Sequence, residues 1–321
     1  MNIIAFLSSA IRFSAVFLFG STGETITEKS GHLNLGTPGI MCMGAIGGCV
    51  GANIYVSNAN TIHAVPAILL PLLFALLFAG LTGLLYCFLT VSLRSNQNVT
   101  GLMITTFGVG LAKFIKADLG ESVDAAIGAV CTHFRNLFPF ADNLGWFGEI
   151  FFSYGILVYL AIAVAVATAI ILKKTRVGLH LRAVGENPAT ADAAGINVTA
   201  YRYTATVVGS AVSGLGGLFF IFDYMGAWDS GLTSTEALGW LAVALVIFTV
   251  WKPDLGILGS ILFSALYLLP NFVEVSFAMR DLFNMLPYIV TIVVLVLTSM
   301  RKKRESQPPA NLGLNYFREE R

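Results

Sequence analysis

Residues that could carry chemistry are few and scattered in this chain. Its four histidines, His32, His63, His133 and His180, show none of the spacings typical of metal ligands. The sequence has no G-x-x-x-x-G-K-[ST] loop for ATP phosphates, no H-E-x-x-H zinc motif and no G-x-S-x-G nucleophile motif. We therefore expect no catalytic residue, no bound metal and no cofactor on this chain.

The four cysteines, Cys42, Cys49, Cys87 and Cys131, form no C-x-x-C pair. The first three lie in apolar stretches, where a free cysteine usually packs as a small hydrophobic residue. A metal site is the remote alternative.

The composition indicates an integral membrane protein. Hydrophobic residues make up 56% of the 321, and charged residues only 12%, about half the share of a soluble domain. The mean hydropathy is +0.78. A soluble fold of this length could not hide so much apolar surface from water. The net charge of +1 gives no indication of nucleic-acid binding.

Apolar runs long enough to cross a bilayer predict an all-α polytopic membrane protein with about nine transmembrane helices, within a range of eight to ten. Arg12 interrupts the first run, and the second run is glycine-rich, so we expect it to be irregular. No cleavable signal peptide is evident. The predicted segments are 3–23, 38–56, 64–92, 98–116, 152–173, 201–222, 237–251, 255–273 and 282–300.

The distribution of charge gives these segments a direction, because basic loops stay in the cytoplasm. Lys173, Lys174, Arg176 and Arg182 follow the fifth segment, Arg94 follows the third, and Arg301, Lys302, Lys303 and Arg304 follow the last. The segment 117–150 is acidic, with Arg135 opposed by Asp118, Glu121, Asp124, Asp142 and Glu149. We therefore expect 117–150 outside, the C-terminus and the loop 174–200 in the cytoplasm, and, with nine helices, the N-terminus outside.

Small residues recur at four-residue spacing in two segments. The second contains Gly44, Gly47, Gly48 and Gly51, and the sixth contains Ser210, Ser213, Gly214 and Gly217. This pattern allows helix backbones to approach closely, and plain packing is favoured over a role in gating.

The stretch from Arg182 to Asn197 is the strongest local signal. Asn187 is placed to cap a short helix, with Pro188 in its first turn. Alanines favour the helix, and Gly195 is suited to end it in the left-handed conformation. The result is a small-faced helix over about 186–194, which could fit a groove on a partner or lie as an ordinary surface helix.

Two stretches resemble one known family. Residues 182–198 read R-A-V-G-E-N-P-A-T-A-D-A-A-G-I-N-V, similar to the coupling-loop motif of ABC importer permeases that serve branched-chain amino acids, simple sugars and nucleosides. Residues 23–36 read G-E-T-I-T-E-K-S-G-H-L-N-L-G, similar to the nucleoside and simple-sugar branch. One departure follows, because Thr37-Pro38-Gly39 stands where that branch has an acidic residue before glycine. The resemblance covers nearly the whole chain.

The resemblance implies a fold like that of the vitamin B12 importer permease and a function in ATP-driven uptake of nucleosides or simple sugars. We expect one permease domain over 1–304. The tail over 305–321 is short and polar and carries Pro308-Pro309, so we expect it to be cytoplasmic and disordered. The partners of this chain would be a second permease subunit, expected to be a related but different chain, ABC ATPase subunits and an extracytoplasmic solute-binding (lipo)protein. The chain itself would lie in the cell membrane, in contact with lipid. ATP and magnesium would bind to the ATPase. The coupling residues would be Arg182, Gly185, Glu186, Asn187, Pro188, Ala191, Ala194, Gly195 and Ile196.

A substrate path is predicted from uncharged polar groups near the membrane segments. These are Asn34, Asn96, Gln97, Thr105 and Thr106, with Phe107 and Trp240 as aromatic candidates that could stack a base or pack in the core. Asn98 and Thr100 are more consistent with helix capping.

Three other functions stay open. A permease for branched-chain amino acids belongs to the same family. A standalone secondary transporter would need ionisable groups at the middle of the membrane, which the sequence does not show. A membrane enzyme would need a nucleophile or a metal cluster.

Overall fold

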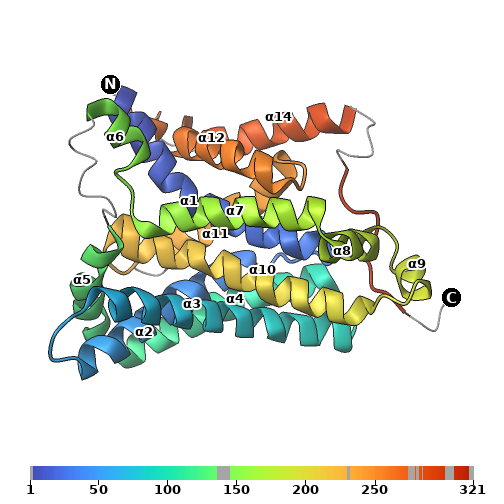
Figure 1. Ribbon diagram of the computed structural model, residues 1–321, viewed down its shortest axis with the longest axis horizontal. Coiled ribbons are helices and arrows are strands. Elements are labelled where there is room, and N and C mark those ends of the chain that lie inside the picture. The colour runs from blue at the N-terminus through green and yellow to red at the C-terminus, as the bar shows by residue number, and fades with distance from the viewer. Residues whose placement is uncertain are drawn as a thin grey trace.

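The computed structural model describes residues 3–135, 145–229, 232–273, 279, 282–283, 285–300 and 307–317. In these residues the secondary structure is helical, and the long helices run roughly side by side in one bundle (Figure 1). An all-α membrane protein, as predicted, is therefore confirmed.

The main helices are α1 (Ile3–Glu28), α2 (Thr37–Asn58), α3 (Ala64–Cys87), α4 (Gln97–Leu119), α5 (Ser122–Phe134), α6 (Gly145–Phe151), α7 (Ile156–Lys174), α8 (Arg176–Glu186), α9 (Pro188–Ala193), α10 (Val198–Phe219), α11 (Thr233–Phe248), α12 (Pro253–Phe272) and α14 (Leu286–Met300). Two π-helical turns, η1 (Phe88–Ser92) and η3 (Phe220–Met225), extend α3 and α10.

Seven of the nine predicted segments match helices that are long and apolar enough to cross a membrane: α1, α2, α3 with η1, α4, α7, α10 with η3, and α12. The other two correspond to α11 and α14, which have 16 and 15 residues.

Side chains explain several helix starts. Asn96 accepts a hydrogen bond from the Val99 amide at 3.1 Å, and Asn197 accepts one from the Ala200 amide at 3.0 Å.

The prediction of an irregular second segment is wrong, because α2 is an unbroken helix over all 22 of its residues. Its glycines are used for packing. A Cβ on Gly47 would lie 2.6 Å from the Phe74 carbonyl oxygen of α3, and one on Gly44 would overlap the backbone of Gly214 in α10. Tertiary contacts with α3 and α10 thus stabilise a helix that glycine propensity alone disfavours.

The bundle has a buried centre and an apolar exterior. The α2 and α10 helices are the most enclosed spans, whereas only a third of the apolar stretch of α3 and of α4 is buried. On α3, Leu69, Leu73, Leu77 and Leu81 form an exposed stripe at four-residue spacing. Such a stripe suits lipid or another apolar helix rather than water. All four cysteines are buried without disulfides, which for Cys42, Cys49 and Cys87 agrees with the predicted packing role.

The two ends of the bundle differ. The N-terminus, α5 and α6 lie at one end, and α8, α9 and the C-terminal tail lie at the other, which we call the loop end (Figure 1). The parts of 117–150 that the structure describes are therefore opposite the segment 174–200. Asp142 and the basic run Arg301, Lys302, Lys303 and Arg304 lie outside the described residues.

Candidate functional site

The segment between α7 and α10 forms two helices joined at Asn187. The Asn187 side chain accepts a hydrogen bond from the Thr190 amide at 3.0 Å, and Pro188 occupies the first turn of α9. Gly195 follows with φ +82°, the left-handed conformation that ends helices. The cap, the proline and the terminating glycine agree with the prediction, while α8 was not foreseen as a separate helix.

One face of α9 is buried and the other is exposed. Pro188 and Ala191 are buried, and Ala191 packs in a small apolar cluster with Val184 and Val198. The exposed face consists of small side chains: Ala189, Thr190, Ala193 and Ala194. Because these side chains are small, the exposed surface of α9 is shallow.

The predicted coupling residues fall into two groups on this segment. Gly185, Pro188 and Ala191 are buried, so they position the segment. The remaining residues are exposed or half-buried and form its outer surface: Arg182, Glu186, Asn187, Ala194, Gly195 and Ile196.

Gly185 brings this segment into contact with two distant parts of the chain. A Cβ there would overlap the Lys29 carbonyl oxygen, in the loop that follows α1. The Gly185 carbonyl also accepts a hydrogen bond from the Asn311 amide at 3.0 Å. The end of α8 is therefore fixed between the α1–α2 loop and the C-terminal tail.

The expected disordered tail is instead packed on the loop end over residues 307–317. The Gly313 amide donates to the Gly31 carbonyl at 3.2 Å. The Gln97 side chain donates to the Leu314 carbonyl at 3.3 Å, and the Tyr316 hydroxyl donates to Asp192 at 2.8 Å. The low hydrophobicity of the tail predicts disorder, but here backbone and side-chain groups far away in the sequence bind it.

The motif at 23–36 forms a buried polar network at the same end. The Glu24 side chain accepts hydrogen bonds from the backbone amide of Asn34 at 3.3 Å and from the Thr37 hydroxyl. The Glu28 side chain accepts one from the Trp251 indole. The motif glutamates therefore join the end of α1 to the start of α2 and to the α11–α12 connection.

His32, in the loop between α1 and α2, is fully buried between η1 and α10. One ring nitrogen contacts the Thr206 hydroxyl at 2.9 Å and the other contacts Thr90 at 2.8 Å. Burial, together with the nearby charge of Arg202, lowers the pKa of His32 to about 3, so the ring is neutral at physiological pH. A neutral imidazole with both nitrogens bonded is a structural link between α3 and α10.

The polar residues predicted for a substrate path mostly hold loops in place. Asn34 accepts from the Gly36 amide at 2.9 Å, Asn96 caps α4, and Gln97 accepts from the Leu33 amide at 2.9 Å. The Thr105 hydroxyl donates to the Leu35 carbonyl at 2.9 Å. The capping role suggested for Asn98 and Thr100 belongs to Asn96.

The remaining path candidates lie elsewhere. Thr106 and Phe107 face outward on α4, with Phe107 47% exposed. Trp240 is half-buried on α11.

A charged cluster at the opposite end was missed by the sequence reasoning. The Arg12 guanidinium pairs with Asp223 at 3.0 Å, and Arg135 donates to the Asp223 carbonyl at 2.9 Å. The charge of Arg12, which interrupts the first apolar run, is thereby matched inside the fold. The sequence signals this cluster only through Arg12 within the first apolar run and Asp223 directly after the sixth.

The described residues thus form a multi-pass helical membrane bundle that carries a capped, small-faced helix outside its apolar spans. The chain belongs to the family described as the permease component of the branched-chain amino acid transport system, which matches residues 6–295.

Three relatives are similar to this chain over most of its length. The nucleoside ABC transporter permease protein NupC of Lactococcus lactis is 31% identical over 92% of this chain and 94% of its own length. The guanosine ABC transporter permease protein NupQ of Bacillus subtilis is 30% identical over the whole of both chains. TsgC13 of Haloferax volcanii, named as a glucose ABC transporter permease, is 31% identical over 81% of this chain and 75% of its own length. No solved structure matches the chain at a significant level.

Proposed function

We propose that this chain is the permease subunit of an ATP-driven importer that takes up nucleosides or simple sugars by alternating access. The observation that carries the proposal is α9, a capped helix with a small exposed face, fixed through Gly185 to the loop after α1. Two relatives with nucleoside names and one with a glucose name support this choice of substrate over branched-chain amino acids.

In this proposal the loop end faces the cytoplasm and α9 sits in a cleft of an ABC ATPase subunit. ATP and magnesium bind to that ATPase, and this chain makes no covalent chemistry. ATP binding brings the ATPase subunits together and moves α9. Because Gly185 is in contact with the loop after α1, the movement reaches α1 and α2 as a rigid-body change.

The outer face of α4 is the proposed position of a second, related permease subunit. Phe107 is exposed there beside Met103, and Thr106 adds a hydroxyl group to the same surface. Polar and aromatic groups facing outward from an apolar helix suit a path between two subunits better than contact with lipid. An extracytoplasmic solute-binding protein would deliver the solute at the opposite end.

Uptake in cells that express the chain with its ATPase, second permease and binding protein tests the proposal. Ala194→Trp places a bulky ring on the exposed face of α9, whereas Ala167→Trp places it on the exposed face of α7. We expect Ala194→Trp to insert normally but to lose uptake of labelled nucleoside and co-purification of the ATPase. Ala167→Trp should keep both.

Full uptake by Ala194→Trp, or uptake without any ATPase, would contradict the proposal. The second outcome, with dependence on a proton or sodium gradient, would favour a secondary transporter. Competition by unlabelled nucleoside, glucose and leucine identifies the substrate class, and competition by leucine alone would favour the amino-acid alternative.

A further inference from the structure

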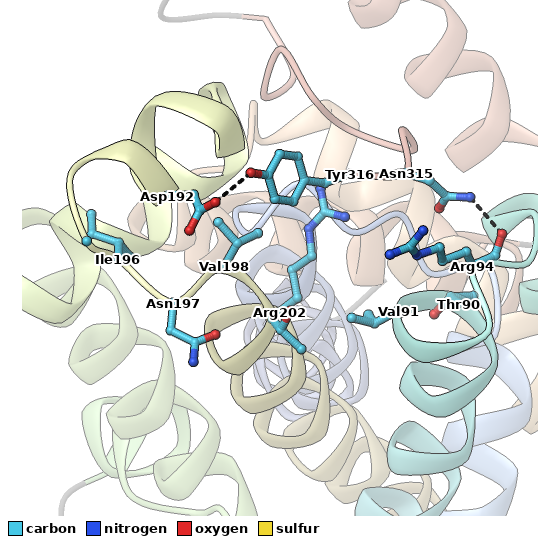
Figure 2. A pocket seen from close by; sticks show the side chains of 12 residues that line it. Thr90, Val91, Arg94, Asp192, Ile196, Asn197, Val198, Arg202, Asn315 and Tyr316 are labelled. Atoms are coloured by element: carbon cyan, nitrogen blue, oxygen red, sulfur yellow. Dashed lines mark hydrogen bonds between the residues drawn. The ribbon is translucent and has the colours of Figure 1, made fainter. Parts of the chain in front are cut away.

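A polar cavity of about 330 Å³ lies at the loop end, between the end of η1, the start of α10 and the C-terminal tail (Figure 2). Arg94 and Arg202 line it from different elements, and Figure 2 shows both guanidinium groups extending into the space beneath the tail. The cavity size lies within the range of roughly 300–1,000 Å³ that small-molecule sites occupy.

Arg202 is the buried cation of this cavity. Its side chain is only 3% exposed, its Nη2 donates to the Leu314 carbonyl at 3.3 Å, and its Nε has no hydrogen-bond partner. A guanidinium carries five donors and stays protonated in proteins. Leaving a buried charge partly unpaired is costly, so this group is poised to accept an anion.

Arg94 approaches from the other side of the cavity. The Arg94 guanidinium lies 4.8 Å from the ring centroid of Phe317. The backbone carbonyl of Arg94 accepts a hydrogen bond from the Asn315 side chain at 2.9 Å. The tail therefore holds Arg94 in place. Within the part of the chain that the structure describes, no ion pair joins either arginine to a carboxylate.

The rest of the lining agrees with a negatively charged ligand. Val198 and Thr199, in the first turn of α10, border the cavity, and a helix N-terminus attracts anions through its dipole and its unpaired amides. One carboxylate, Asp192, also lines the cavity. It accepts the Tyr316 hydroxyl on the α9 side, across from Arg94 (Figure 2).

We propose that this cavity binds a phosphate group, held by Arg94, Arg202 and the first turn of α10. Paired guanidinium groups match the geometry of phosphate oxygens, and arginine is favoured over lysine for such contacts. The phosphate could belong to a soluble nucleotide or to the headgroup of an anionic lipid, since the cavity lies where membrane spans end.

Binding to the purified full-length chain tests the site without ATPase subunits, which bind nucleotides themselves. In maltoside detergent, which contains no phosphate, calorimetry measures the affinity for adenosine 5′-monophosphate, inorganic phosphate and adenosine. In nanodiscs of phosphatidylcholine with and without phosphatidylglycerol, native mass spectrometry measures retained phosphatidylglycerol. The variants are Arg94→Gln, Arg94→Lys and, as a control, Arg176→Gln, an exposed arginine outside the cavity.

A phosphate site predicts that the monophosphate binds and adenosine does not, or that phosphatidylglycerol is retained. The first result identifies a soluble ligand and the second a lipid. In either case Arg94→Gln should weaken binding about tenfold or more, because a charge-assisted hydrogen bond is lost. Arg94→Lys should lose less, Arg176→Gln should bind like the parent chain, and added salt should weaken binding.

The proposal is overturned if neither arm shows phosphate-dependent binding, or if Arg94→Gln and Arg176→Gln weaken it equally. Neither result depends on transport, so it leaves the proposed function separately testable. Arg94 is exposed, and unchanged thermal stability of Arg94→Gln would show that lost binding does not reflect misfolding.

Discussion

Gly47→Ala is the sharpest test of how the centre of this bundle is packed. A Cβ at Gly47 would lie 2.6 Å from the Phe74 carbonyl oxygen and 2.8 Å from the Phe78 Cβ, both on α3. Because one of these atoms belongs to the backbone, no rotation of a side chain relieves the overlap. The α2 and α3 helices must therefore move apart.

The size of the effect follows from this geometry. Ordinary contact begins at 3.4 Å, so the nearest atom must retreat by 0.8 Å, the difference between 3.4 and 2.6 Å. Backing away from α3 is blocked, because Gly44 on the same helix already touches the backbone of Gly214 in α10. Overpacking of this kind costs about 1–3 kcal/mol, and the better helix propensity of alanine returns up to about 1 kcal/mol.

Gly110→Ala is the matched control. Gly110 lies within α4, and a Cβ there would meet nothing within 4 Å. This substitution should be neutral or slightly stabilising, since only helix propensity changes. We expect the two variants to differ by about 2 kcal/mol, which corresponds to roughly 3 °C in Tm for a chain of 321 residues.

Thermal unfolding with a thiol-reactive fluorophore measures this difference. All four cysteines are buried and free, so labelling reports unfolding. Equal Tm values for Gly47→Ala and Gly110→Ala would refute the argument that α2 is held closely between α3 and α10.

Three further predictions concern the loop end. Gly185→Ala should insert normally but lose uptake, because its methyl group overlaps the Lys29 carbonyl; transport assays with membrane quantification measure this. Tyr316→Phe should speed hydrogen exchange in α9 about fivefold, since one hydrogen bond to Asp192 is worth about 1 kcal/mol. The lowered pKa of His32 should make stability fall as pH drops below about 6.5, by about 2 kcal/mol at pH 5, because the unfolded chain binds the proton first.

Each of these has its own control. Wild-type uptake by Gly185→Ala would argue against a close contact at Lys29. Tyr203→Phe also removes a tyrosine hydroxyl, one that contacts Ser92 at 2.5 Å, and should leave exchange in α9 unchanged. Tm measured from pH 7 to 5 should fall less steeply in His32→Gln than in the parent chain, and parallel profiles would contradict the assignment to His32.

Local patterns were readable from the sequence where the cause of the structure is itself local. The cap at Asn187, the proline after it and the left-handed Gly195 fix α9 within a few residues, so its bounds were predicted closely. The apolar runs likewise predict the spans, because a bilayer demands length and hydrophobicity from each helix separately. The recurring glycines predicted close packing but not which helices would meet.

Contacts between distant residues decided the rest. The glycine-rich second segment is a continuous helix because α3 and α10 pack directly against its glycines. Arg12 is tolerated because the fold brings Asp223 to it. Four polar groups assigned to a substrate path, Asn34, Asn96, Gln97 and Thr105, bond to backbone groups, and only the fold brings those groups to Gln97 and Thr105.

The C-terminal tail shows most clearly the difference between structure with local causes and structure decided by distant contacts. Its composition indicates disorder, and nothing in its own sequence identifies Gly31, Gly185 or Asp192 as partners. The sequence by itself determined that this is a multi-span membrane protein with a capped helix outside the bilayer. Tertiary structure alone fixed that helix to the α1–α2 loop and closed an arginine-lined cavity beneath the tail, because both depend on groups far apart along the chain.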